Sequence, residues 1–458
     1  MDILAPARKL ARSSYKDLTL KKLYPDRYRK EAEKPVVKGK VVFLEVREEA
    51  LTDNFRLIRA ALEKRNERAG KSLYRMSTIC IREGMAGRLE VMQNCLNAIP
   101  KIADAEFIFV NEVSYFLSCL PIRPGTTVIQ TWHACGAFKK FGYSAVGQGF
   151  GTSREDLDRY PVHRNFDYVT VSGPEVIWAY AEAFHMEDRR EAILPIGVSR
   201  TDMFFHSRYR DKACGKTAWV LRRMAPQLFC PAAEDAGADR VPGSEAYGDA
   251  AVRDGMNQDM AAGTEKNTAC LVPGRKIILY APTFRGSVGD AVSPDRLDLV
   301  RMKEALGRDH ILLIKHHPFV KERPRIPDEA ADFAFDMTDR LTIEELITSA
   351  DICITDYSSI IFEYSLFERP LIFFAFDLDS YLDERGFYYP QQDMMPGPVC
   401  RTQEELIRVL QNARENFDLA RVRGFKYRFM SGCDGHATAR VLELMDRCAS
   451  GEKVKASS

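Results

Sequence analysis

Short apolar runs alternate with helix-like stretches through most of this chain. Each run holds four to six residues and is rich in Val, Ile, Leu or Phe, a pattern typical of strands that are buried on both faces of a parallel sheet. In the first half of the chain the runs are Val41–Val46, Glu106–Val110, Thr127–Thr131, Tyr168–Ser172 and Ile193–Val198. In the second half they are Lys276–Ala281, Ile311–His316, Phe333–Met337, Ile352–Thr355 and Leu371–Phe376. Their alternation with helices predicts repeated βαβ units and an α/β fold with parallel sheets.

Other segments depart from this alternation. Residues 211–273 are rich in Ala, Gly, Asp and Pro; a helix is predicted at Thr217–Leu228, and a mobile surface insertion at 231–268, which shows no clear period. Near the end of the chain, Thr402–Cys448 is predicted to be helical because its apolar residues recur at helical spacing. The polar tail at 451–458 is predicted to be disordered.

The pattern therefore divides the chain into six parts. They are a basic arm at residues 1–38, a first parallel-sheet domain at 39–210, a linker with the insertion at 211–273, a second parallel-sheet domain at 274–400, C-terminal helices at 401–450 and the tail at 451–458. Open α/β sheets bind ligands beyond the carboxyl ends of their strands. We therefore expect a cleft between the two domains, lined by residues that directly follow the apolar runs.

The composition fits an ordinary globular protein. The chain has 458 residues, 45% of them hydrophobic and 29% charged, and a formal net charge of +1 that gives no electrostatic argument for a nucleic-acid partner. Its eleven cysteines are scattered and form no CxxC pair, so neither a zinc site nor a disulfide framework is predicted. No apolar run reaches the roughly 18 residues of a membrane span, and the N-terminus lacks the apolar core of a secretory signal. The sequence predicts a protein of the cytoplasm or its membrane face, with no metal or cofactor.

The charge is uneven along the chain. Residues 1–40 carry twelve Lys and Arg against five Asp and Glu, with leucines such as Leu10, Leu18 and Leu20 among them. Such a segment suits an anionic membrane surface. It is equally typical of a solvated arm that contains one marginal helix.

The first polar cluster follows the run at Thr127–Thr131. His133 comes almost directly after this strand, and a histidine whose pKa lies near working pH can remove the proton of an attacking hydroxyl. Gly136 would let the backbone approach a ligand, and Lys139 or Lys140 could meet a phosphate. The alternative is a loop histidine that is hydrogen-bonded to the backbone.

Two further clusters offer arginine for phosphate recognition. Arg200 and Asp202 follow one strand, where the arginine either binds phosphate or forms a structural pair with the aspartate. Thr283 and Arg285 follow another, and the planar guanidinium of an arginine suits phosphate oxygens. A solvated loop arginine is the plainer interpretation of the second cluster.

Two adjacent histidines end the run at Ile311–His316. Because side chains alternate along a strand, only one of His316 and His317 can easily aim at the cleft. The other is predicted to be a packing residue. No third ligand at suitable spacing accompanies them, so a metal site is not predicted.

The most informative cluster follows Ile352–Thr355. Asp356 ends the strand, and Ser358 and Ser359 open an apolar helix whose N-terminus could bind phosphate. Glu363 lies about one turn inside that helix and could hold ribose hydroxyls. Plain helix capping by Asp356 or a serine is the alternative, and capping and phosphate binding can coexist.

Taken in order, these motifs resemble the CDP-glycerol:glycerophosphate glycerophosphotransferases of teichoic acid synthesis, over about Thr126 to Leu444. The resemblance is carried by Trp132-His133 with Gly136, Lys139-Lys140-Phe-Gly142, Tyr280-Ala-Pro-Thr-Phe-Arg285, His317-Pro318, Thr355-Asp356-Tyr-Ser-Ser359, the stretch Phe376-Asp377 to Phe387, and Pro396-Gly397-Pro398-Val399. The Ala-Cys-Gly-Ala stretch after His133 is more similar to members that add the first glycerol phosphate than to long-chain polymerases. Two departures, Ser199 where the family usually has proline and a long insertion, concern the choice of acceptor more than the chemistry.

The resemblance implies a GT-B-like fold, in which two Rossmann-like domains face a cleft and a C-terminal helix crosses back. It implies that the donor CDP-glycerol binds mainly to the C-terminal domain. It also implies that the glycerol phosphate of the donor passes to a hydroxyl of a lipid-linked saccharide or glycerol-phosphate acceptor, and that CMP leaves. The reaction would then take place at the inner face of the membrane. The site residues that it implies are His133 as general base, Arg285, His317, Ser358 and Ser359 on the pyrophosphate, Glu363 on the ribose, Thr283 and Asp356 at the donor, and Gly136, Lys139, Lys140, Arg200 and Asp202 at the acceptor or its phosphate.

Alternatives remain at this point. A nucleotide-sugar glycosyltransferase would use the same fold and cleft, and the motifs do not separate CDP-glycerol from CDP-ribitol or a related donor. A binding or scaffold protein without catalysis would keep the fold, but the intact set of His133, Arg285, His317 and Asp356–Ser359 speaks against it. The sequence gives neither the acceptor, the number of units added, the oligomeric state, nor the role of residues 231–268.

Overall fold

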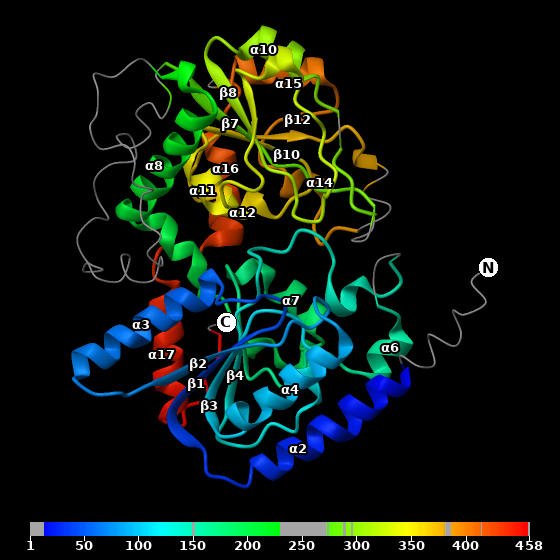
Figure 1. Cartoon of the computed structure of the whole chain (residues 1–458), viewed down its shortest axis with the longest axis vertical. Coiled ribbons are helices and arrows are strands. Elements are labelled where there is room, and N and C mark those ends of the chain that lie inside the picture. The colour runs from blue at the N-terminus through cyan, green and yellow to red at the C-terminus, as the bar shows by residue number, and fades with distance from the viewer. Residues whose placement is uncertain are drawn as a thin grey trace, which may run out of the picture. The chain divides into compact units, whose positions relative to one another are not determined.

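The structure is a computed structural model that describes residues 13–148, 152–229, 272, 274–286, 290–294, 296–379, 381, 386–413 and 415–456. The chain divides into two compact units, each built around its own parallel sheet (Figure 1). Unit 1 comprises Met1–Ala134, Phe141–Asp202 and Gly432–Ser458, and unit 2 comprises Cys135–Lys140 and Met203–Ser431. The chain therefore enters unit 2 twice and returns to unit 1 each time.

Within the described residues, the sheet of unit 1 has six parallel strands in the order β2-β1-β3-β4-β5-β6. The strands are β1 (Val37–Glu45), β2 (Arg75–Cys80), β3 (Ala105–Val110), β4 (Thr127–Gln130), β5 (Tyr168–Thr170) and β6 (Ile193–Leu194). All residues of the central strand β3 are buried. Burial on both faces explains why its sequence is a nearly continuous apolar run rather than an alternating one.

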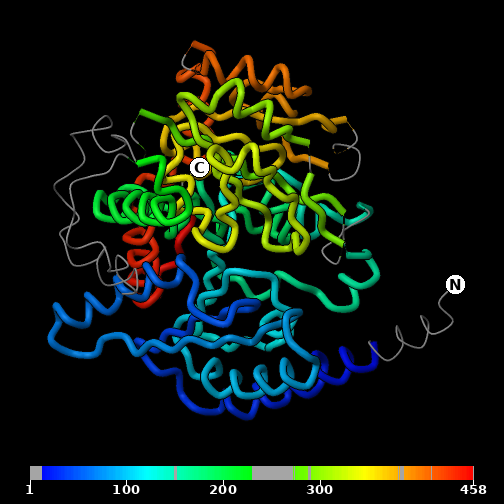
Figure 2. Tube along the Cα trace, turned by 45° about the horizontal axis from the view of Figure 1, so that its top comes forward, coloured from blue at the N-terminus to red at the C-terminus, as the bar shows by residue number. Residues whose placement is uncertain are grey.

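Helices cover both faces of this sheet. They are residues 13–18, η1 (Thr19–Leu23), α2 (Tyr24–Glu31), α3 (Asp53–Ala69), α4 (Arg88–Ile102), α5 (Tyr115–Cys119), η2 (Gly142–Ala145), α6 (Arg154–Arg159), η3 (Pro174–Val176), α7 (Ile177–Phe184), η4 (Glu187–Ala192) and α17 (Ala437–Ala449). On one face α3 and α17 lie side by side and pack onto Phe43 and Phe109 of the strands. Figure 2 shows α2, in blue, running beside α4.

The described part of unit 2 repeats this plan, with six parallel strands in the order β12-β11-β10-β7-β8-β9. The strands are β7 (Lys276–Tyr280), β8 (His310–Ile314), β9 (Ala334–Asp336), β10 (Ile352–Thr355), β11 (Leu371–Phe374) and β12 (Val399–Cys400). One core cluster joins Ile278, Leu312, Ile354 and Ile372 from four neighbouring strands. Apolar burial of this extent is the main force that holds such a sheet and its helices together.

The helices of unit 2 begin with α8 and end with α16. They are α8 (Ser207–Met224), η6 (Pro226–Leu228), α10 (Leu299–Leu306), η8 (Asp328–Ala330), α11 (Ile343–Ser349), α12 (Ile360–Ser365), α14 (Gln391–Met394), α15 (Gln403–Gln411) and α16 (Leu419–Met430). Helix α8 is tied to α11 by an ion pair of 2.7 Å between Lys216 and Glu345 and by a hydrogen bond of 2.9 Å between Thr217 and Ser349. The remaining helix η5 (Ser199–Phe205) leads from unit 1 into unit 2.

The ten apolar runs of the sequence all contain strands, and the α/β prediction is confirmed. Two strands were not predicted. Strand β2 was missed because it includes the polar residues Arg75, Ser77 and Thr78 and only one of its six residues is buried. Strand β12 has two residues, too few to form a recognisable apolar run. The expected helix at Thr217–Leu228 is the second half of the longer α8 and the turn after it.

The predicted C-terminal helix that crosses back is confirmed. After α16 the chain returns to unit 1 at Gly432, and α17 joins the core of unit 1 through Val441 and Met445. The carboxylate of Asp202 fixes this return, because it accepts hydrogen bonds from the backbone N–H groups of Ala437 (3.0 Å) and Thr438 (2.7 Å) at the start of α17. An anionic group at a helix N-terminus is favourable both as a hydrogen-bond acceptor and toward the helix dipole.

The structure differs from the predictions for the two ends of the chain. The tail from residue 451 is not disordered over its described part, because Val454 is buried in the core of unit 1 and its N–H donates to the Tyr168 hydroxyl. Of the two interpretations of the basic arm, the solvated arm does not hold from residue 13 onward, because Tyr24 and Tyr28 are 3% and 1% exposed. The predicted insertion at 231–268 and residues 1–12 lie outside the described residues.

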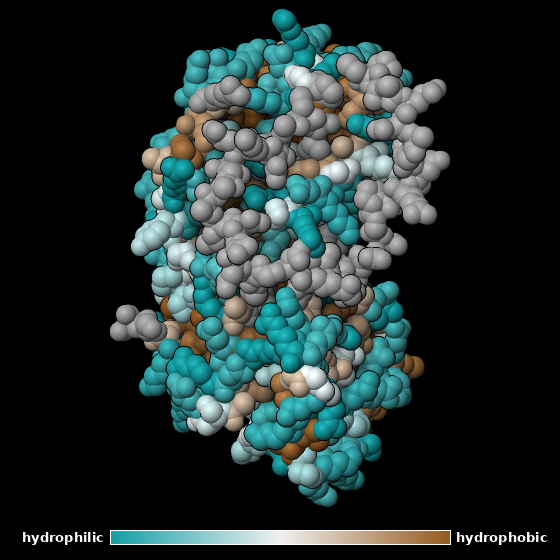
Figure 3. Space-filling view, turned by 90° about the vertical axis from the view of Figure 1, so that its left-hand side faces the viewer, coloured by the Kyte–Doolittle hydropathy of each residue, from teal (hydrophilic) through white to brown (hydrophobic). Residues whose placement is uncertain are grey.

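Two properties of the described residues concern the membrane question. None of their helices is both long enough and apolar enough to span a bilayer. Among the atoms that Figure 3 colours, hydrophilic ones dominate, and the hydrophobic ones form small separate areas on that face.

Candidate functional site

In unit 1 the site begins with a strained turn after β4. Trp132 is buried and has a φ of 53°, a left-handed conformation that costs a residue with a side chain roughly 1–3 kcal/mol. Its N–H donates to the side-chain oxygen of Gln130 over 2.8 Å, which stabilises the turn. The strained turn therefore lies directly before His133.

His133 is paired with a carboxylate that the sequence did not reveal. Its Nδ1 lies 2.9 Å from Oε1 of Glu112 and 3.3 Å from the carbonyl oxygen of Asn111. Both neighbours are acceptors, so Nδ1 carries the hydrogen, and the lone pair of the neutral ring is on Nε2. The side chain is 47% exposed, and a neutral ring in this tautomer can accept a proton at Nε2.

Glu112 is suited to support such a proton transfer. Burial alone would raise its pKa, but the hydrogen bond and charge of His133, together with the charge of Arg47, lower the pKa below its usual value. The Arg47 guanidinium lies 3.5 Å from the carboxylate. The carboxylate thus stays ionised and can stabilise the imidazolium that forms when His133 accepts a proton.

Asn54 connects two loops that the sequence placed near a ligand. Its amide nitrogen donates to the carbonyl oxygen of Trp132 over 2.9 Å, and its amide oxygen accepts from the backbone N–H of Arg200 over 2.8 Å. Asn54 is 3% exposed. The structure therefore connects Arg200 to the His133 loop through a residue of α3 that carries no sequence signal of its own. The predicted contact of Arg200 with an acceptor or its phosphate stays a prediction.

Asp202 has a different role from the one predicted. The sequence placed it with Arg200 at the acceptor or its phosphate. Both of its oxygens instead accept hydrogen bonds from α17, and the side chain is 3% exposed. Burial raises its pKa, and the amides of Thr438 and Ala437 offset part of that effect. We regard Asp202 as a cap of α17.

In unit 2, Arg285 is held by two carboxylates. Its Nε and one terminal nitrogen donate to the two oxygens of Asp377 over 2.7 and 3.0 Å, and the same terminal nitrogen donates to Asp356 over 3.0 Å. The other terminal nitrogen donates to the carbonyl oxygen of Thr283 over 2.8 Å. Burial opposes the charge, but these carboxylates raise the pKa of Arg285 above its usual range. The predicted phosphate ligand is thus fixed in place as a cation.

Asp356 and Thr283, predicted at the donor, build the frame of this arrangement. One oxygen of Asp356 accepts hydrogen bonds from the Thr283 N–H (2.8 Å), the Thr283 hydroxyl (2.6 Å) and the Tyr357 N–H (2.6 Å). Asp356 is 2% exposed. These contacts join the loop after β7 to the loop after β10, so both residues position neighbouring groups.

His317 has the opposite tautomer to His133. Its Nδ1 accepts a hydrogen bond of 3.2 Å from the N–H of Phe319, so the hydrogen of the neutral ring is on Nε2, which is then a donor. Burial, and secondarily the charge of Lys139, lower the pKa of His317. A neutral donor of this kind suits a phosphate oxygen. His316 is buried and hydrogen-bonded to Ser293 over 3.0 Å, as expected for the packing partner.

The segment Cys135–Lys140 belongs to unit 2 although it begins only two residues after His133. The Lys140 N–H donates to the carbonyl oxygen of Gly386 over 3.2 Å, and Lys139 forms an isolated bridge with Phe387. The Lys139 ammonium lies 5.3 Å from the centre of the Tyr381 ring, and its charge acts on His317. Lys139 and His317, both predicted, therefore share one neighbourhood.

Gly136 serves packing in the structure. Its φ is 62°, and a Cβ at this position would lie 2.2 Å from the ring of Phe362 in α12. Phe362 is fully buried and stacks on Phe425. The glycine is thus required by its conformation and by this ring; its predicted contact with a ligand stays a prediction.

The remaining predicted residues lie at the start of α12. The Ser358 hydroxyl accepts a hydrogen bond of 3.4 Å from the Ile360 N–H, and Ser359 is exposed. Glu363 is 6% exposed, so a ribose could contact its side chain only by lying directly against α12. Among the residues that the structure describes, no three His, Cys, Asp or Glu side chains are grouped in a way that could hold a metal ion.

Comparisons with known proteins agree on one family. The family model described as CDP-Glycerol:Poly(glycerophosphate) glycerophosphotransferase matches residues 27–222 and 249–446. The teichoic acid ribitol-phosphate primase of Bacillus spizizenii is 33% identical, over 90% of this chain and 92% of that protein. The teichoic acid glycerol-phosphate primase of Bacillus subtilis is 26% identical, over 78% of this chain and 77% of that protein.

Longer relatives and a solved structure complete the comparison. The teichoic acid poly(ribitol-phosphate) polymerase of Bacillus spizizenii is 31% identical over 89% of this chain, but the match spans only 56% of the polymerase. The structure of the wall teichoic acid polymerase TagF matches with a TM-score of 0.63 at 21% identity, over 97% of this chain and 98% of that chain. At this identity the likeness shows the fold, which is GT-B-like.

Proposed function

Because this chain belongs to the CDP-glycerol glycerophosphotransferase family, we propose that it transfers a polyol phosphate from a CDP-activated polyol to a hydroxyl group of a teichoic-acid-type acceptor. The observation that carries this proposal is the pair of Glu112 and His133, which presents the Nε2 lone pair as a general base at the end of β4. The relatives named above are primases and polymerases of polyol phosphates, so a nucleotide-sugar glycosyltransferase is not favoured.

In the proposed reaction, the acceptor oxygen forms a bond to the polyol-bearing phosphorus of the donor. The bond from that phosphorus to the oxygen of CMP breaks, and the hydroxyl proton passes to Nε2 of His133. The ionised Glu112 stabilises the resulting imidazolium. General base catalysis of this kind contributes a factor of about 10²–10⁴ to the rate.

Unit 2 would supply positive charge and hydrogen-bond donors for the pyrophosphate. Phosphoryl transfer depends mainly on positioning and charge neutralisation. The Nε2–H of His317 and the Lys139 ammonium offer both. The charge of Arg285 is balanced by Asp377 and Asp356, so Arg285 stays a proposed ligand of the pyrophosphate that adds no net positive charge. Ser358 and Ser359 stay proposed ligands of the pyrophosphate, and Glu363 of the ribose.

We further propose that the chain acts as a primase, which adds the first unit or a few units. It spans 92% of the ribitol-phosphate primase but about half, 56%, of the ribitol-phosphate polymerase. A match over most of the length of a primase supports this proposal. The Ala-Cys-Gly-Ala stretch after His133 points the same way.

Two donors are candidates. The motifs imply CDP-glycerol, whereas the greater identity to the ribitol-phosphate primase (33%) than to the glycerol-phosphate primase (26%) favours CDP-ribitol. Purified protein should be given each donor separately, with a lipid-linked disaccharide as acceptor, and CMP release measured. Acceptor-dependent release with one of them supports the proposal. Release from UDP- or GDP-sugars alone would replace it with glycosyl transfer, and donor binding without any CMP release would indicate a protein that only binds.

The proposed acceptor is lipid-linked, which would place the protein in the cytoplasm at the inner face of the cell membrane. The basic N-terminal segment supports this placement. Because Tyr24 and Tyr28 are buried, deletion of residues 1–35 would also damage unit 1. Substitution of the exposed Lys21 and Lys22 by glutamate is the cleaner change. It should weaken co-sedimentation with anionic vesicles, and unchanged co-sedimentation would remove the N-terminal contact from the proposal.

A further inference from the structure

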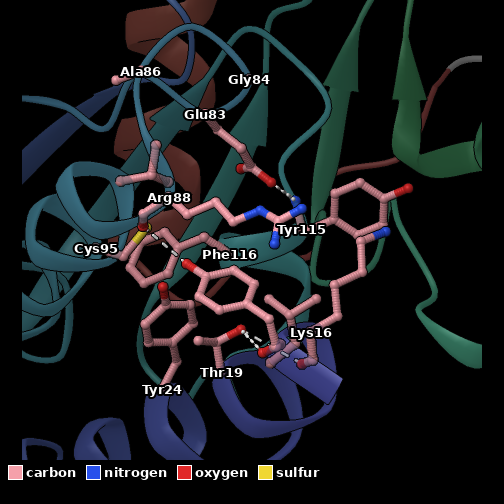
Figure 4. A pocket seen from close by; sticks show the side chains of 13 residues that line it. Lys16, Thr19, Tyr24, Glu83, Gly84, Ala86, Arg88, Cys95, Tyr115 and Phe116 are labelled. Atoms are coloured by element: carbon pink, nitrogen blue, oxygen red, sulfur yellow. Dashed lines mark hydrogen bonds between the residues drawn. The ribbon is translucent and has the colours of Figure 1, made fainter. Parts of the chain in front are cut away.

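A cavity of about 330 Å³ lies in unit 1 between the N-terminal helices and the start of α4. Figure 4 shows it from close by, with the rings of Tyr24 and Phe116 on one side and that of Tyr115 on the other. Leu20 and Val91 also line it. Its volume is at the lower end of the roughly 300–1,000 Å³ found for small-molecule sites.

The polar groups of its wall bind mainly to one another. The Tyr15 hydroxyl donates to the carbonyl oxygen of Arg88 over 3.0 Å, and the Thr19 hydroxyl donates to that of Tyr15 over 2.8 Å. The carboxylate of Glu83 accepts from the N–H of Tyr115 over 3.1 Å. What such a wall presents to a ligand is largely ring faces and aliphatic carbon, so it suits a hydrocarbon chain better than a sugar or a nucleotide.

Large apolar side chains next to the lining residues are left in water. Leu18 is 58% exposed, Met85 59% and Leu89 75%. They come from the N-terminal helix and from the segment before and at the start of α4, which the bond between Tyr15 and Arg88 holds together. Each of them is a neighbour in the chain of a residue that lines the cavity, namely Thr19, Gly84 or Ala86, and Arg88, and exposed apolar side chains beside a cavity are typical of an interaction surface.

Positive charge accompanies these apolar groups. The Lys16 ammonium lies 4.1 Å from the centre of the Tyr115 ring, and both residues line the cavity. Arg88 lines it too, and its side chain extends toward the middle of the view in Figure 4. An apolar cavity flanked by cations matches an amphiphile with a hydrocarbon chain and an anionic head group.

The cavity lies at the same edge of the sheet as the proposed base. Strands β3 and β4 are parallel neighbours, so their carboxyl ends meet at one edge. Glu112, the partner of His133, follows β3, and the cavity residues Tyr115 and Phe116 come three and four positions later in the chain.

We propose that this cavity holds the hydrocarbon chain of the lipid-linked acceptor, next to its anionic phosphate group. The inference rests on the proposed function, because it assigns a site to the lipid of that acceptor. The enzyme would then recognise the lipid portion of its substrate as well as the hydroxyl that reacts.

The test fills the cavity. In Val91→Trp and Leu20→Trp the indole should occupy the space of the chain, whereas Leu73→Trp changes an exposed leucine of unit 1 outside the lining. Each variant receives the long-chain lipid-linked acceptor and a short-chain, water-soluble analogue. We expect the filling variants to raise KM for the long-chain acceptor roughly tenfold or more, the loss that follows when a few methylene groups no longer leave water. The short-chain kcat and the Leu73→Trp variant should be unchanged.

Equal KM values for the long-chain acceptor in filled and unfilled protein would overturn the proposal. A second result would also overturn it: Leu89→Ser loses vesicle binding while both filling variants keep wild-type kinetics. The exposed apolar side chains would then serve membrane contact alone. Binding of a long-chain fluorescent alkyl phosphate, below the concentration at which it forms micelles, separates this inference from the proposed function. If no acceptor supports CMP release, the transferase assignment fails; loss of probe binding in the filling variants would still support the cavity, and undiminished binding would overturn it.

Discussion

Replacement of Glu112 by glutamine tests the proposed catalytic pair in unit 1. The amide keeps the size of the side chain but removes the charge 2.9 Å from Nδ1 of His133. It can also offer an N–H to Nδ1, which favours the tautomer that leaves no lone pair on Nε2. Both effects should slow the transfer step without changing how the donor binds in unit 2.

The magnitude follows from the strength of the lost interaction. A hydrogen bond to a charged group is worth about 1.5–3 kcal/mol, which corresponds to a factor of roughly 10–150 in rate. Because the His133 side chain is 47% exposed, solvent screens the charge, and we expect the lower part of this range, a loss of roughly 10–30-fold in kcat. His133→Ala should lose about 10²–10⁴-fold.

The assay is CMP release by the two single variants and the double variant, with Glu63→Gln as a control at a partly exposed carboxylate of α3. If Glu112 acts through His133, its substitution should have almost no further effect in the His133→Ala background. An equal loss in both backgrounds would refute the reasoning, because Glu112 would then act independently of the histidine. Matching unfolding temperatures would exclude a general loss of folding.

Three further predictions concern stability. Burial lowers the pKa of His163 to about 3, so between about pH 6.5 and pH 3 the unfolded chain binds a proton that the folded chain does not. The free energy of unfolding should therefore fall with decreasing pH in this window, by at most about 1.4 kcal/mol per pH unit. Denaturant titrations at several pH values should show a flatter slope for His163→Phe. Asp202→Ala should cost roughly 1–3 kcal/mol, because two amides of α17 lose their acceptor, and an unchanged denaturation midpoint would contradict the cap. Gly136→Ala should cost roughly 2–4 kcal/mol through its φ and the ring of Phe362; wild-type stability would show that the ring can move.

The sequence predicted the fold well because parallel sheets leave a strong pattern. Strands such as β3 and β10 are buried on both faces, so their apolar runs stand out without any alignment. The edge strand β2 has a mixed pattern and was missed for the same physical reason. The buried Val454 was missed because a single apolar residue in a polar tail gives no period.

The candidate site was predicted in part. His133, Arg285 and His317 lie in loops that follow strands, as predicted, whereas Arg200 lies in the helix η5. The partners of these residues depend on tertiary contacts that no spacing reveals. Glu112 could have been suspected, because it follows the run at Glu106–Val110 by two positions.

Charge alone did not separate ligand-binding from structural roles. Asp356 was placed at the donor, yet it accepts hydrogen bonds from Thr283 and Arg285 and builds the frame around them. Asp377 does the same from the loop after β11. Both carboxylates hold a cation in position, a role that a sequence pattern cannot distinguish from direct contact with a ligand.

The central claim is that His133 is the base of a CDP-polyol phosphotransferase. Its most direct test is acceptor-dependent CMP release from CDP-ribitol and CDP-glycerol by the wild-type protein and by His133→Ala. The account predicts release by the wild type with at least one donor, and a loss of about 10²–10⁴-fold in the variant, which should remain folded. Near-normal turnover by the folded variant would contradict the role of His133, and no release from either donor would contradict the transferase itself.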